Sequence, residues 1–425
     1  MAQTTGQWSE YLDLATLTDV GMRRSVNQDS HVVVLASDPE SWITRGHVFI
    51  VADGMGAHAA GELASKLAVD NIPHTYYKLA EFPAPAALEK SIVEANALIH
   101  RRGEADSEFH GMGTTCSALA ILPHGAVCAH VGDSRIYRLR GTKLEQLSFD
   151  HSLVWEMAAA GKLKDQEVPS FIPKNVITRS LGPNAQVQVD VEGPFPIQPG
   201  DRFLLCSDGL TGPVDDKELG AILASLSLDD AVQTLVDLAN LRGGPDNITV
   251  VALEVKDPQF GGAAQIQPQE AKKVKKGPIH PAAIGVVGVC LLAGCVLAIL
   301  QQLLVAGICA GVALLAGLLG HFQRFETDTP LLGPQPIGGP FGRGPHRAYD
   351  SEPNEELLAK FHDMLSRLND AAQRENWAID WEKFQQLRSA AESARNGRDF
   401  KTALKNYCEA IRFVLSELRH SGERR

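Results

Sequence analysis

The sequence predicts a mixed α and β fold, followed by an apolar segment and a helical C-terminal region. Short apolar runs closed by Gly-containing turns are typical of buried strands, and they occur at residues 47–51, 126–131 and 203–206. Residues 10–20 fit a first strand, and residues 60–70 and 86–102 carry apolar side chains at helical spacing. Residues 1–256 are therefore expected to form one mixed domain.

Length and charge limit the classes of function. With 425 residues, 44% of them hydrophobic, the chain is long enough for more than one domain and a substantial core. Residues 1–256 carry 20 Lys and Arg against 33 Asp and Glu, whereas the remainder carries 20 against 18. The excess of acidic residues in residues 1–256 argues against nucleic acid as a partner. Ordinary solubilising surface charge explains most of this excess.

The cysteines predict a reducing compartment. Their number is odd and none forms a CxxC pair, so we expect neither a disulfide framework nor a zinc site. They are Cys116, Cys128, Cys206, Cys290, Cys295, Cys309 and Cys408. The first ten residues have no basic region and no apolar core, so we expect no secretory signal and a cytoplasmic location for residues 1–256.

Short aspartate motifs recur along the first 250 residues. They are NQD ending at Asp29, VADG at Asp53, VGDSR at Asp133, CSDG at Asp208 and PDN at Asp246. Three of them follow the apolar runs directly, where a rigid strand passes into a loop. Carboxylates gathered at one point repel one another unless cations neutralise them. Hard oxygen donors without a His or Cys cluster predict Mg²⁺ or Mn²⁺.

The order and spacing of these motifs resemble those of the metal-dependent protein serine/threonine phosphatases of type 2C, in their bacterial form. The matching stretches are DVGMRRSVNQDS (19–30), VADGMGAHAAGELAS (51–65), GMGTTCSAL (111–119), HVGDSRIYRLR (130–140), LSFDHSLV (147–154), ITRSLG (177–182), FLLCSDGLTGPV (203–214) and GGPDNITVV (243–251). The resemblance covers about residues 11–256. It implies an α+β fold in which two antiparallel β-sheets pack face to face and are flanked by helices, with residues 152–180 as a flap beside the site.

The resemblance also assigns roles to the aspartates, around two or three Mn²⁺ or Mg²⁺ ions. Asp53 would bridge two ions, with the backbone carbonyl of Gly54 on the second. Asp208 and Asp246 would complete the shell of the first ion, and Asp133 would help Asp208 to hold a third, weaker one. Hydrolysis of a phosphate monoester would then proceed by attack of a water that bridges the metals.

Two further residues are assigned by position. Arg24 matches the phosphate-binding arginine of the family, and its planar fork suits a phosphate dianion. Its neighbour Arg23 is interpreted as a solvated charge. Asp29 would act from the outer shell of the metals, through water.

The loop after the second motif departs from the family. It reads DGMGAH where bacterial relatives usually carry DGMGGH, so Ala57 would be strained if it had a positive φ. Animal relatives place a general acid directly after the DG pair, where this sequence has Met55. Protonation of the leaving group would fall to metal-bound water or to His58, for which a role in stabilising the loop is an equal alternative. Thr114 and Thr115 are expected to pack or hydrogen-bond near the site.

An uncharged segment predicts a membrane anchor. Residues 257–281 form a linker that ends in the basic cluster KKVKK, and residues 282–320 then carry no charge. One spanning helix needs about 20 residues, so two topologies remain open: a hairpin of spans 282–300 and 303–320, or one tilted helix. The lysines favour a cytoplasmic N-terminal side. We therefore expect lipid as a partner and an inner-membrane location, with the catalytic domain in the cytoplasm.

The C-terminal part predicts a linker and helices. Residues 321–354 are rich in Pro and Gly and predict a flexible linker, and residues 355–420 predict a small helical domain. Apolar groups at helical spacing are Leu357, Phe361, Leu365 and Leu368; then Trp377, Trp381, Phe384 and Leu387; then Phe400, Ala403, Leu404, Tyr407, Ala410, Ile411 and Val414. Residues 399–411 resemble one tetratricopeptide helix, but an array needs about three repeats, so an ordinary bundle is the alternative. These helices are a candidate surface for an unidentified protein partner.

Together these patterns predict a membrane-tethered phosphoprotein phosphatase that acts on the products of serine/threonine kinases. A narrower alternative is a phosphatase of one signalling regulator. The alternative from another class is a non-catalytic membrane scaffold that retains the fold. Intact Asp53, Asp208 and Asp246 argue against the scaffold, because a pseudoenzyme has no need of clustered carboxylates.

Overall fold

The chain forms two compact units. Met1–Ala263 together with Gln335–Arg425 forms the first unit, and Ala264–Pro334 forms the second. The computed structural model describes residues 11–57, 59–161, 176–257 and 340–422, together with Leu292, Ala293, Cys295, Val296 and Ile299. Apart from those five helical positions, the predicted membrane segment 282–320 lies outside the described residues. Within the described part of the chain, no helix is long and apolar enough to cross a bilayer.

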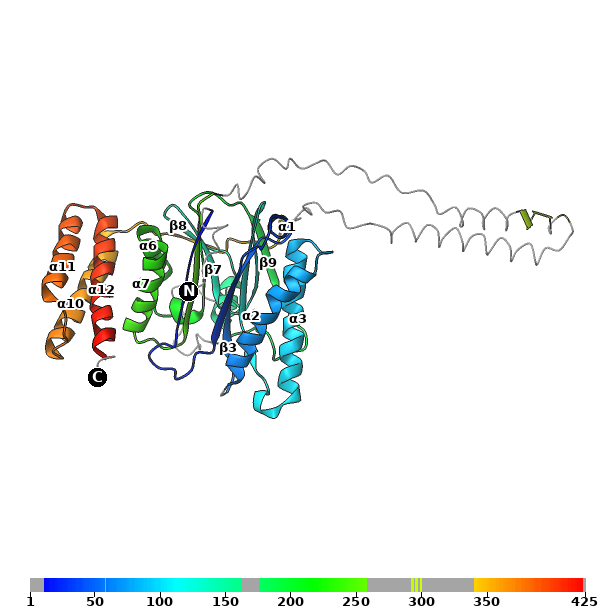
Figure 1. Ribbon diagram of the computed structural model, residues 1–425, viewed down its shortest axis with the longest axis horizontal. Helices are drawn as coiled ribbons and strands as arrows, with labels where there is room; N and C mark the ends of the chain where they lie inside the picture. The colour runs from blue at the N-terminus through cyan, green and yellow to red at the C-terminus, as the bar shows by residue number, and fades with distance from the viewer. Residues whose placement is uncertain are drawn as a thin grey trace. The chain divides into compact units, whose positions relative to one another are not determined.

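Two antiparallel sheets pack face to face at the centre of the first unit (Figure 1), as the resemblance implies. Sheet A has the order β1 (Leu12–Asp19), β11 (Ile248–Val255), β10 (Arg202–Cys206), β7 (Arg135–Arg140), β8 (Lys143–Gln146) and β12 (Arg347–Asp350). Sheet B has the order β2 (Asp29–Val34), β3 (His47–Met55), β5 (Cys116–Leu122), β6 (Gly125–Val131) and β9 (Asp190–Phe195), and β4 (Gly113–Thr114) pairs with β3.

The strand β3 shows why the predicted buried runs are apolar throughout. Val48, Ile50 and Ala52 belong to the core between sheet B and its covering helices. Phe49 and Val51 lie in the core between the two sheets. Because successive side chains of a strand point to opposite faces, a strand that is covered on both faces needs apolar residues at every position.

Helices cover the outer faces of both sheets (Figure 1). On sheet B lie α2 (Ala60–Lys78) and α3 (Ala84–Ala105), and on sheet A lie α6 (Asp216–Ser225) and α7 (Leu228–Leu241). The connections contain α1 (Pro39–Thr44), η1 (Ser107–Phe109), α4 (Leu153–Ala159) and α5 (Asp208–Thr211). The first strand and the two helices predicted from apolar spacing are confirmed by β1, α2 and α3.

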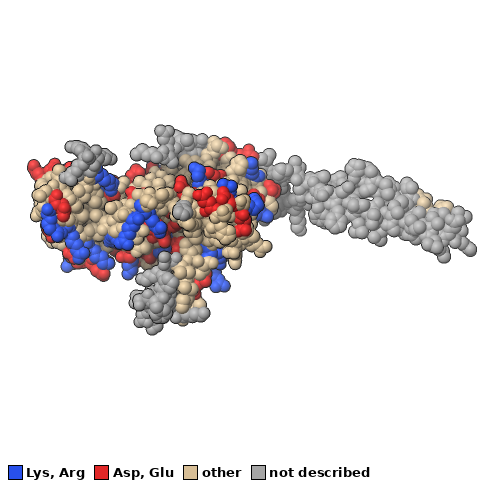
Figure 2. Space-filling model, turned by 90° about the horizontal axis from the view of Figure 1, so that it is seen from below, with Lys and Arg blue, Asp and Glu red and all other residues tan. Residues whose placement is uncertain are grey.

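The predicted C-terminal helices are present as α10 (Glu355–Arg374), α11 (Trp381–Asn396) and α12 (Phe400–Gly422). Within the first unit, α12 packs on α6 and α7, and α10 and α11 pack on α12. Leu358, Phe361, Tyr407 and Ile411 are fully buried in the same apolar cluster as Leu235 of α7. Figure 2 shows Lys and Arg intermingled with Asp and Glu over this end of the molecule, the polar surface expected of amphipathic helices.

The expected flexible linker 321–354 was wrong for its last part. Residues 347–350 form β12, which pairs antiparallel with β8 at the edge of sheet A. Ahead of β12, Phe341 forms a bridge with Gly193 of β9 in sheet B. A strand of four residues that follows Pro and Gly carries too little periodic signal to be recognised in a sequence.

Candidate active site where the two sheets meet

The predicted site aspartates come from both sheets. Asp29 and Asp53 are direct partners across the β2–β3 pair of sheet B. Asp208 follows β10 and Asp246 precedes β11, both in sheet A, while Asp133 lies between β6 and β7. The charges of the other four all raise the pKa of Asp53. The fold therefore brings all of these carboxylates into one site.

Burial is the main reason why these carboxyl groups resist ionisation. It raises the pKa of Asp29 and of Asp133 to about 7, and it raises the pKa of Asp208 as well. The pKa of Asp53 lies well above its ordinary value, first because the side chain is buried and then because its neighbours repel its charge. At neutral pH the cluster holds its full negative charge only where cations neutralise it.

The donors present fit hard divalent ions. The Oδ1 atoms of Asp29, Asp133 and Asp208 are buried and have no hydrogen-bond partner among the described residues, and such atoms need a water or a cation. In the same part of the chain, no group of three or more His, Cys, Asp or Glu side chains is arranged to hold an ion alone. The unpartnered donors are all carboxylate oxygens, which suit Mg²⁺ or Mn²⁺, ions that usually keep several water ligands.

The backbone of Asp53 is fixed by two threonines, which confirms their expected place near the site. Thr114 Oγ1 donates to the carbonyl oxygen of Asp53 at 2.9 Å, and the Asp53 amide donates to Thr115 Oγ1 at 2.8 Å. Thr115 Oγ1 also lies 2.8 Å from Ser134 Oγ, next to Asp133. These bonds connect the turn at Asp53 to the turn at Asp133.

The loop after Asp53 needs glycine for a reason that the sequence did not reveal. A Cβ on Gly54 would collide with the carbonyl oxygens of Gly61 and of Gln28, so the start of α2 packs directly on this loop. The positive φ of the loop, 150°, falls on Gly56. Ala57 is not among the described residues with positive φ, so its replacement of glycine carries no such strain. His58 lies outside the described residues.

Arg24 lies at the rim of the cluster. Its Nη2 donates to Asp246 Oδ2 at 2.7 Å, and about half of its side chain is exposed to solvent. A guanidinium at an exposed edge of a carboxylate cluster is placed to bind an incoming phosphate. Arg24 is therefore paired with Asp246, which is itself a predicted metal ligand. The sequence did not indicate this contact. Arg23 beside it is exposed, consistent with a solvated charge.

Sequence reasoning missed two residues that organise the site. Asn247 Nδ2 donates to two carbonyl groups of the loop that carries Arg24, at 2.9 and 3.0 Å, and its Oδ1 accepts from the Gln28 amide at 2.8 Å. Ser207 Oγ donates to Asp29 Oδ2 at 2.7 Å. Both residues adjoin candidate ligand aspartates in the PDN and CSDG motifs, and this adjacency was the available signal.

A sandwich of two antiparallel sheets with buried aspartates from both sheets at one end defines the class of metal-dependent phosphatases. The family model described as Protein phosphatase 2C matches residues 22–241, half of the chain. The chain therefore belongs to the protein phosphatase 2C family, the metal-dependent protein serine/threonine phosphatases. Enzymes of this family use Mn²⁺ or Mg²⁺.

Individual relatives agree with this assignment. The chain is 38% identical to protein phosphatase PhpP of Streptococcus pneumoniae over 252 residues, 58% of this chain and 98% of that protein. It is 38% identical over 242 residues to serine/threonine phosphatase stp of Listeria monocytogenes, 56% of this chain and 93% of that protein. Among solved structures, the serine/threonine phosphatase PstP/Ppp of Mycobacterium tuberculosis is similar with a TM-score of 0.52 at 31% identity, covering 58% of this chain and 100% of that one.

Proposed function

We propose that the protein hydrolyses phosphoserine and phosphothreonine in proteins and is held at a membrane by residues 282–320. The observation that carries the catalytic part is the set of buried, unpartnered carboxylate oxygens beside an exposed arginine. When bound at Asp53, Gly54, Asp133, Asp208 and Asp246, Mn²⁺ or Mg²⁺ supplies an activated water and neutralises the charge on phosphate.

The protein's own residues have separate tasks in this reaction. Arg24 binds phosphate oxygens with its planar fork and orients the ester at the rim of the cluster. Asp29, which accepts a hydrogen bond from Ser207 at 2.7 Å, holds water in the outer shell. His58 is the candidate acid for the leaving group. Burial of the aspartates in a site of low dielectric strengthens each of these electrostatic contacts.

A turnover experiment on the full chain tests the catalytic proposal. We expect hydrolysis of a phosphothreonine peptide that requires Mn²⁺ and stops when a chelator removes it. Mn²⁺ binding without turnover of any general phosphopeptide would favour the narrow phosphatase of one regulator. A chain that neither binds Mn²⁺ nor hydrolyses phosphate esters would be the scaffold, and the proposal would fail.

The membrane topology that we propose is the hairpin. The strand β12 pairs with β8, and α12 packs on α6 and α7, so the chain on both sides of residues 282–320 contributes to one compact unit. A single span would separate these partners by a bilayer, and their shared sheet and core could not form. A hairpin returns the chain to the side on which it entered.

Thiol labelling tests this topology, but Cys408 is unsuitable because it is fully buried. We would place a cysteine at exposed Glu382 of α11, with Glu108→Cys in the catalytic part as the matched reference. The background would lack Cys290, Cys295 and Cys309. In intact cells a membrane-impermeant reagent should label neither site, and after permeabilisation it should label both. Labelling of Glu382→Cys alone in intact cells would contradict the hairpin.

A further inference from the structure

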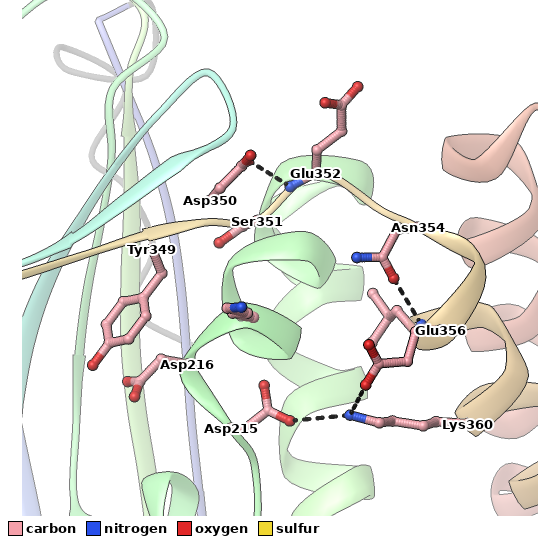
Figure 3. A pocket seen from close by; sticks show the side chains of 11 residues that line it. Asp215, Asp216, Tyr349, Asp350, Ser351, Glu352, Asn354, Glu356 and Lys360 are labelled. Atoms are coloured by element: carbon pink, nitrogen blue, oxygen red, sulfur yellow. Dashed lines mark hydrogen bonds and ion pairs between the residues drawn. The ribbon is translucent and has the colours of Figure 1, made fainter. Parts of the chain in front are cut away.

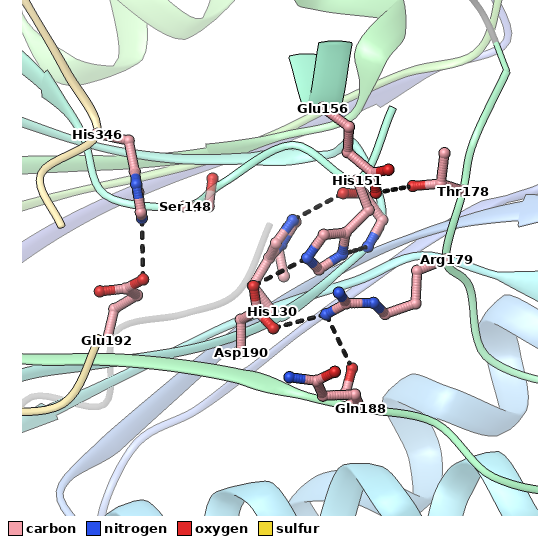
Figure 4. A network of polar contacts seen from close by, with 12 residues as sticks. His130, Ser148, His151, Glu156, Thr178, Arg179, Gln188, Asp190, Glu192 and His346 are labelled. Atoms are coloured by element: carbon pink, nitrogen blue, oxygen red, sulfur yellow. Dashed lines mark hydrogen bonds and ion pairs between the residues drawn. The ribbon is translucent and has the colours of Figure 1, made fainter. Parts of the chain in front are cut away.

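The chain that follows the predicted membrane segment closes one open edge of the β-sandwich. We call residues 341–350 the clasp. Phe341 exchanges two backbone hydrogen bonds with Gly193 of sheet B, at 2.6 and 3.1 Å, and the Gly344 amide donates to Glu192 Oε2 at 2.7 Å. His346 Nε2 lies 2.9 Å from Glu192 Oε1 (Figure 4), and β12 then joins sheet A. The clasp therefore binds the edge strands of both sheets.

The far end of the clasp is fixed to the turn between β7 and β8 and lies beside the start of α6. Ser351, the next residue, donates its amide to the Thr142 carbonyl at 2.8 Å. Lys360 Nζ lies 3.9 Å from Asp215 Oδ2, beside a cavity of about 400 Å³ (Figure 3). In the same view Tyr349 lies next to Asp216. The clasp is thus held at both of its ends.

An arginine of the clasp stacks on α4, the helix that forms the first part of the predicted flap at residues 152–180. The guanidinium carbon of Arg347 lies 3.7 Å from the centre of the Trp155 ring, which is only 7% exposed. Phe149 packs edge-on against both Trp155 and His346, with ring centres 5.6 and 5.4 Å away. A cation over a buried indole is a strong form of cation–π contact. The clasp therefore fixes the position of Trp155 and of α4.

A short series of hydrogen bonds connects Trp155 to the turn that carries Asp133 in the metal centre. The Trp155 amide is capped by Ser152 Oγ at 3.4 Å, and His151 directly precedes Ser152. The His151 amide donates to the Gly132 carbonyl at 2.7 Å, and His151 Nδ1 accepts from the Gly132 amide at 3.0 Å. Gly132 is followed by Asp133. A displacement of α4 therefore shifts the turn that carries this carboxylate.

The opposite side of His151 is also anchored. With Nδ1 as an acceptor, its Nε2 donates to Asp190 Oδ2 at 3.0 Å, and Arg179 Nη1 donates to Asp190 Oδ1 at 2.6 Å (Figure 4). The ring has no freedom to absorb a movement of α4 by rotating. Rigid connections of this kind transmit small shifts instead of dissipating them.

A second route runs through sheet A. Arg347 is the register partner of Gln146 across β12 and β8. Gln146 Nε2 donates to Asp150 Oδ1 at 2.6 Å, and Arg135 Nε donates to Asp150 Oδ2 at 2.8 Å. Arg135 lies two positions after Asp133 in the VGDSR turn. Both routes from Arg347 thus end at the same turn of the metal centre.

We propose that Arg347 is a positioning residue for the Asp133 end of the metal centre, acting through Trp155 and His151. The C-terminal segment, which lies outside the region matched by the family model, then sets the affinity of the weakest ion site. This inference rests on the proposed function, because it needs the cluster to bind metal ions. Loss of a buried cation–π contact should weaken that site by roughly threefold to tenfold.

Calorimetric titration of the full chain with Mn²⁺ tests the inference without reference to activity. Arg347→Ala should weaken the weakest binding step and leave the tighter steps unchanged. Arg347→Lys, which keeps a cation, should retain most of the affinity. Arg343→Ala is the matched control, because Arg343 is an exposed arginine of the same clasp, and it should match the wild type.

Several outcomes would overturn the proposal. These are an unchanged weakest step in Arg347→Ala, an equal loss in Arg343→Ala, or a parallel loss of every step, which would make Arg347 a general structural residue. Trp155→Phe provides a second variant that keeps an aromatic ring, and it should reproduce a smaller weakening of the same step. A wild-type chain that binds no Mn²⁺ would overturn the proposed function itself and this inference with it.

Discussion

Sheets A and B are each covered by two helices, but among the described residues only the helices on sheet A carry a further layer of helices. On sheet B, α3 buries one stripe, formed mainly by Ala84, Ala87, Leu88, Ser91, Ile92, Ala95 and Ile99. On sheet A, α7 buries nine of the twelve residues from Leu228 to Ala239, including Thr234 and Asp237. A helix with one buried stripe is an outer layer, whereas a helix that is buried on two opposite sides lies between two layers.

This difference shows that the C-terminal helices complete one half of the catalytic unit. The apolar cluster of sheet A continues through α7 into α10 and α12. Arg412 pairs with Asp230, and Arg419 pairs with Asp237, whose side chain is only 2% exposed. A buried carboxylate on the outer side of α7 requires such a partner. The half built on sheet B has its own core and shows no comparable dependence among the described residues.

The largest expected effect tests the metal site, to which the covered half contributes Asp208. Asp208→Asn removes a charge that stabilises the transition state, so turnover of a phosphothreonine peptide should fall at least about a hundredfold. Asp229→Asn, at an exposed aspartate of α7, is the control and should keep wild-type activity. Near-wild-type Mn²⁺-dependent rates for Asp208→Asn would remove it from the set of ligands.

The next prediction tests whether the C-terminal helices unfold together with sheet A. Leu358 of α10 and Leu88 of α3 are both fully buried. Leu→Ala at either position should lower the free energy of unfolding by about 2–5 kcal/mol. Denaturant titration of Leu358→Ala should shift one common transition, as Leu88→Ala does. A separate early transition that leaves activity intact would show that the helices are an independent module.

A smaller effect is expected for the rim of the site. Arg24→Ala should weaken substrate binding by roughly tenfold, because a charge-assisted bond to phosphate is lost. Mn²⁺ affinity should stay the same or rise, since the guanidinium no longer competes for Asp246. Parallel titrations with Mn²⁺ and with substrate measure the two effects, with exposed Arg23→Ala as the control. A large loss of metal affinity would make Arg24 structural.

The smallest expected effect is on the pH dependence of stability, through aspartates at the site where the two sheets meet. In the metal-free protein the pKa of Asp29 and of Asp133 is about 7, well above the value of about 4 expected for an unfolded chain. The folded state therefore holds more protons between these pH values, and its stability falls as pH rises through them. Mn²⁺ replaces those protons. The Tm gained from Mn²⁺ should thus increase from pH 5 to pH 8, and a constant gain would contradict this account.

Local sequence patterns predicted several strands of this protein and the aspartates of its candidate site. The runs at 47–51, 126–131 and 203–206 became strands because turn chemistry and apolar composition act over a few residues. The aspartate motifs were found for the same reason, and their predicted convergence is confirmed by mutual effects on pKa. Whether each aspartate binds metal as assigned stays a prediction. The short strand β12 was missed, since the strand with which it pairs, β8, lies about 200 residues earlier.

The sequence by itself determined four of the strands, the amphipathic helices and the positions of the candidate ligands, because each depends on neighbouring residues. Only the tertiary structure decided which distant segments share a core. Ser207 reaches Asp29 across 178 residues, Arg419 reaches Asp237 across 182, and Arg347 stacks on Trp155. Such contacts form between segments that carry no common local signal. They are selected by the packing of the whole chain, which buries both partners at once.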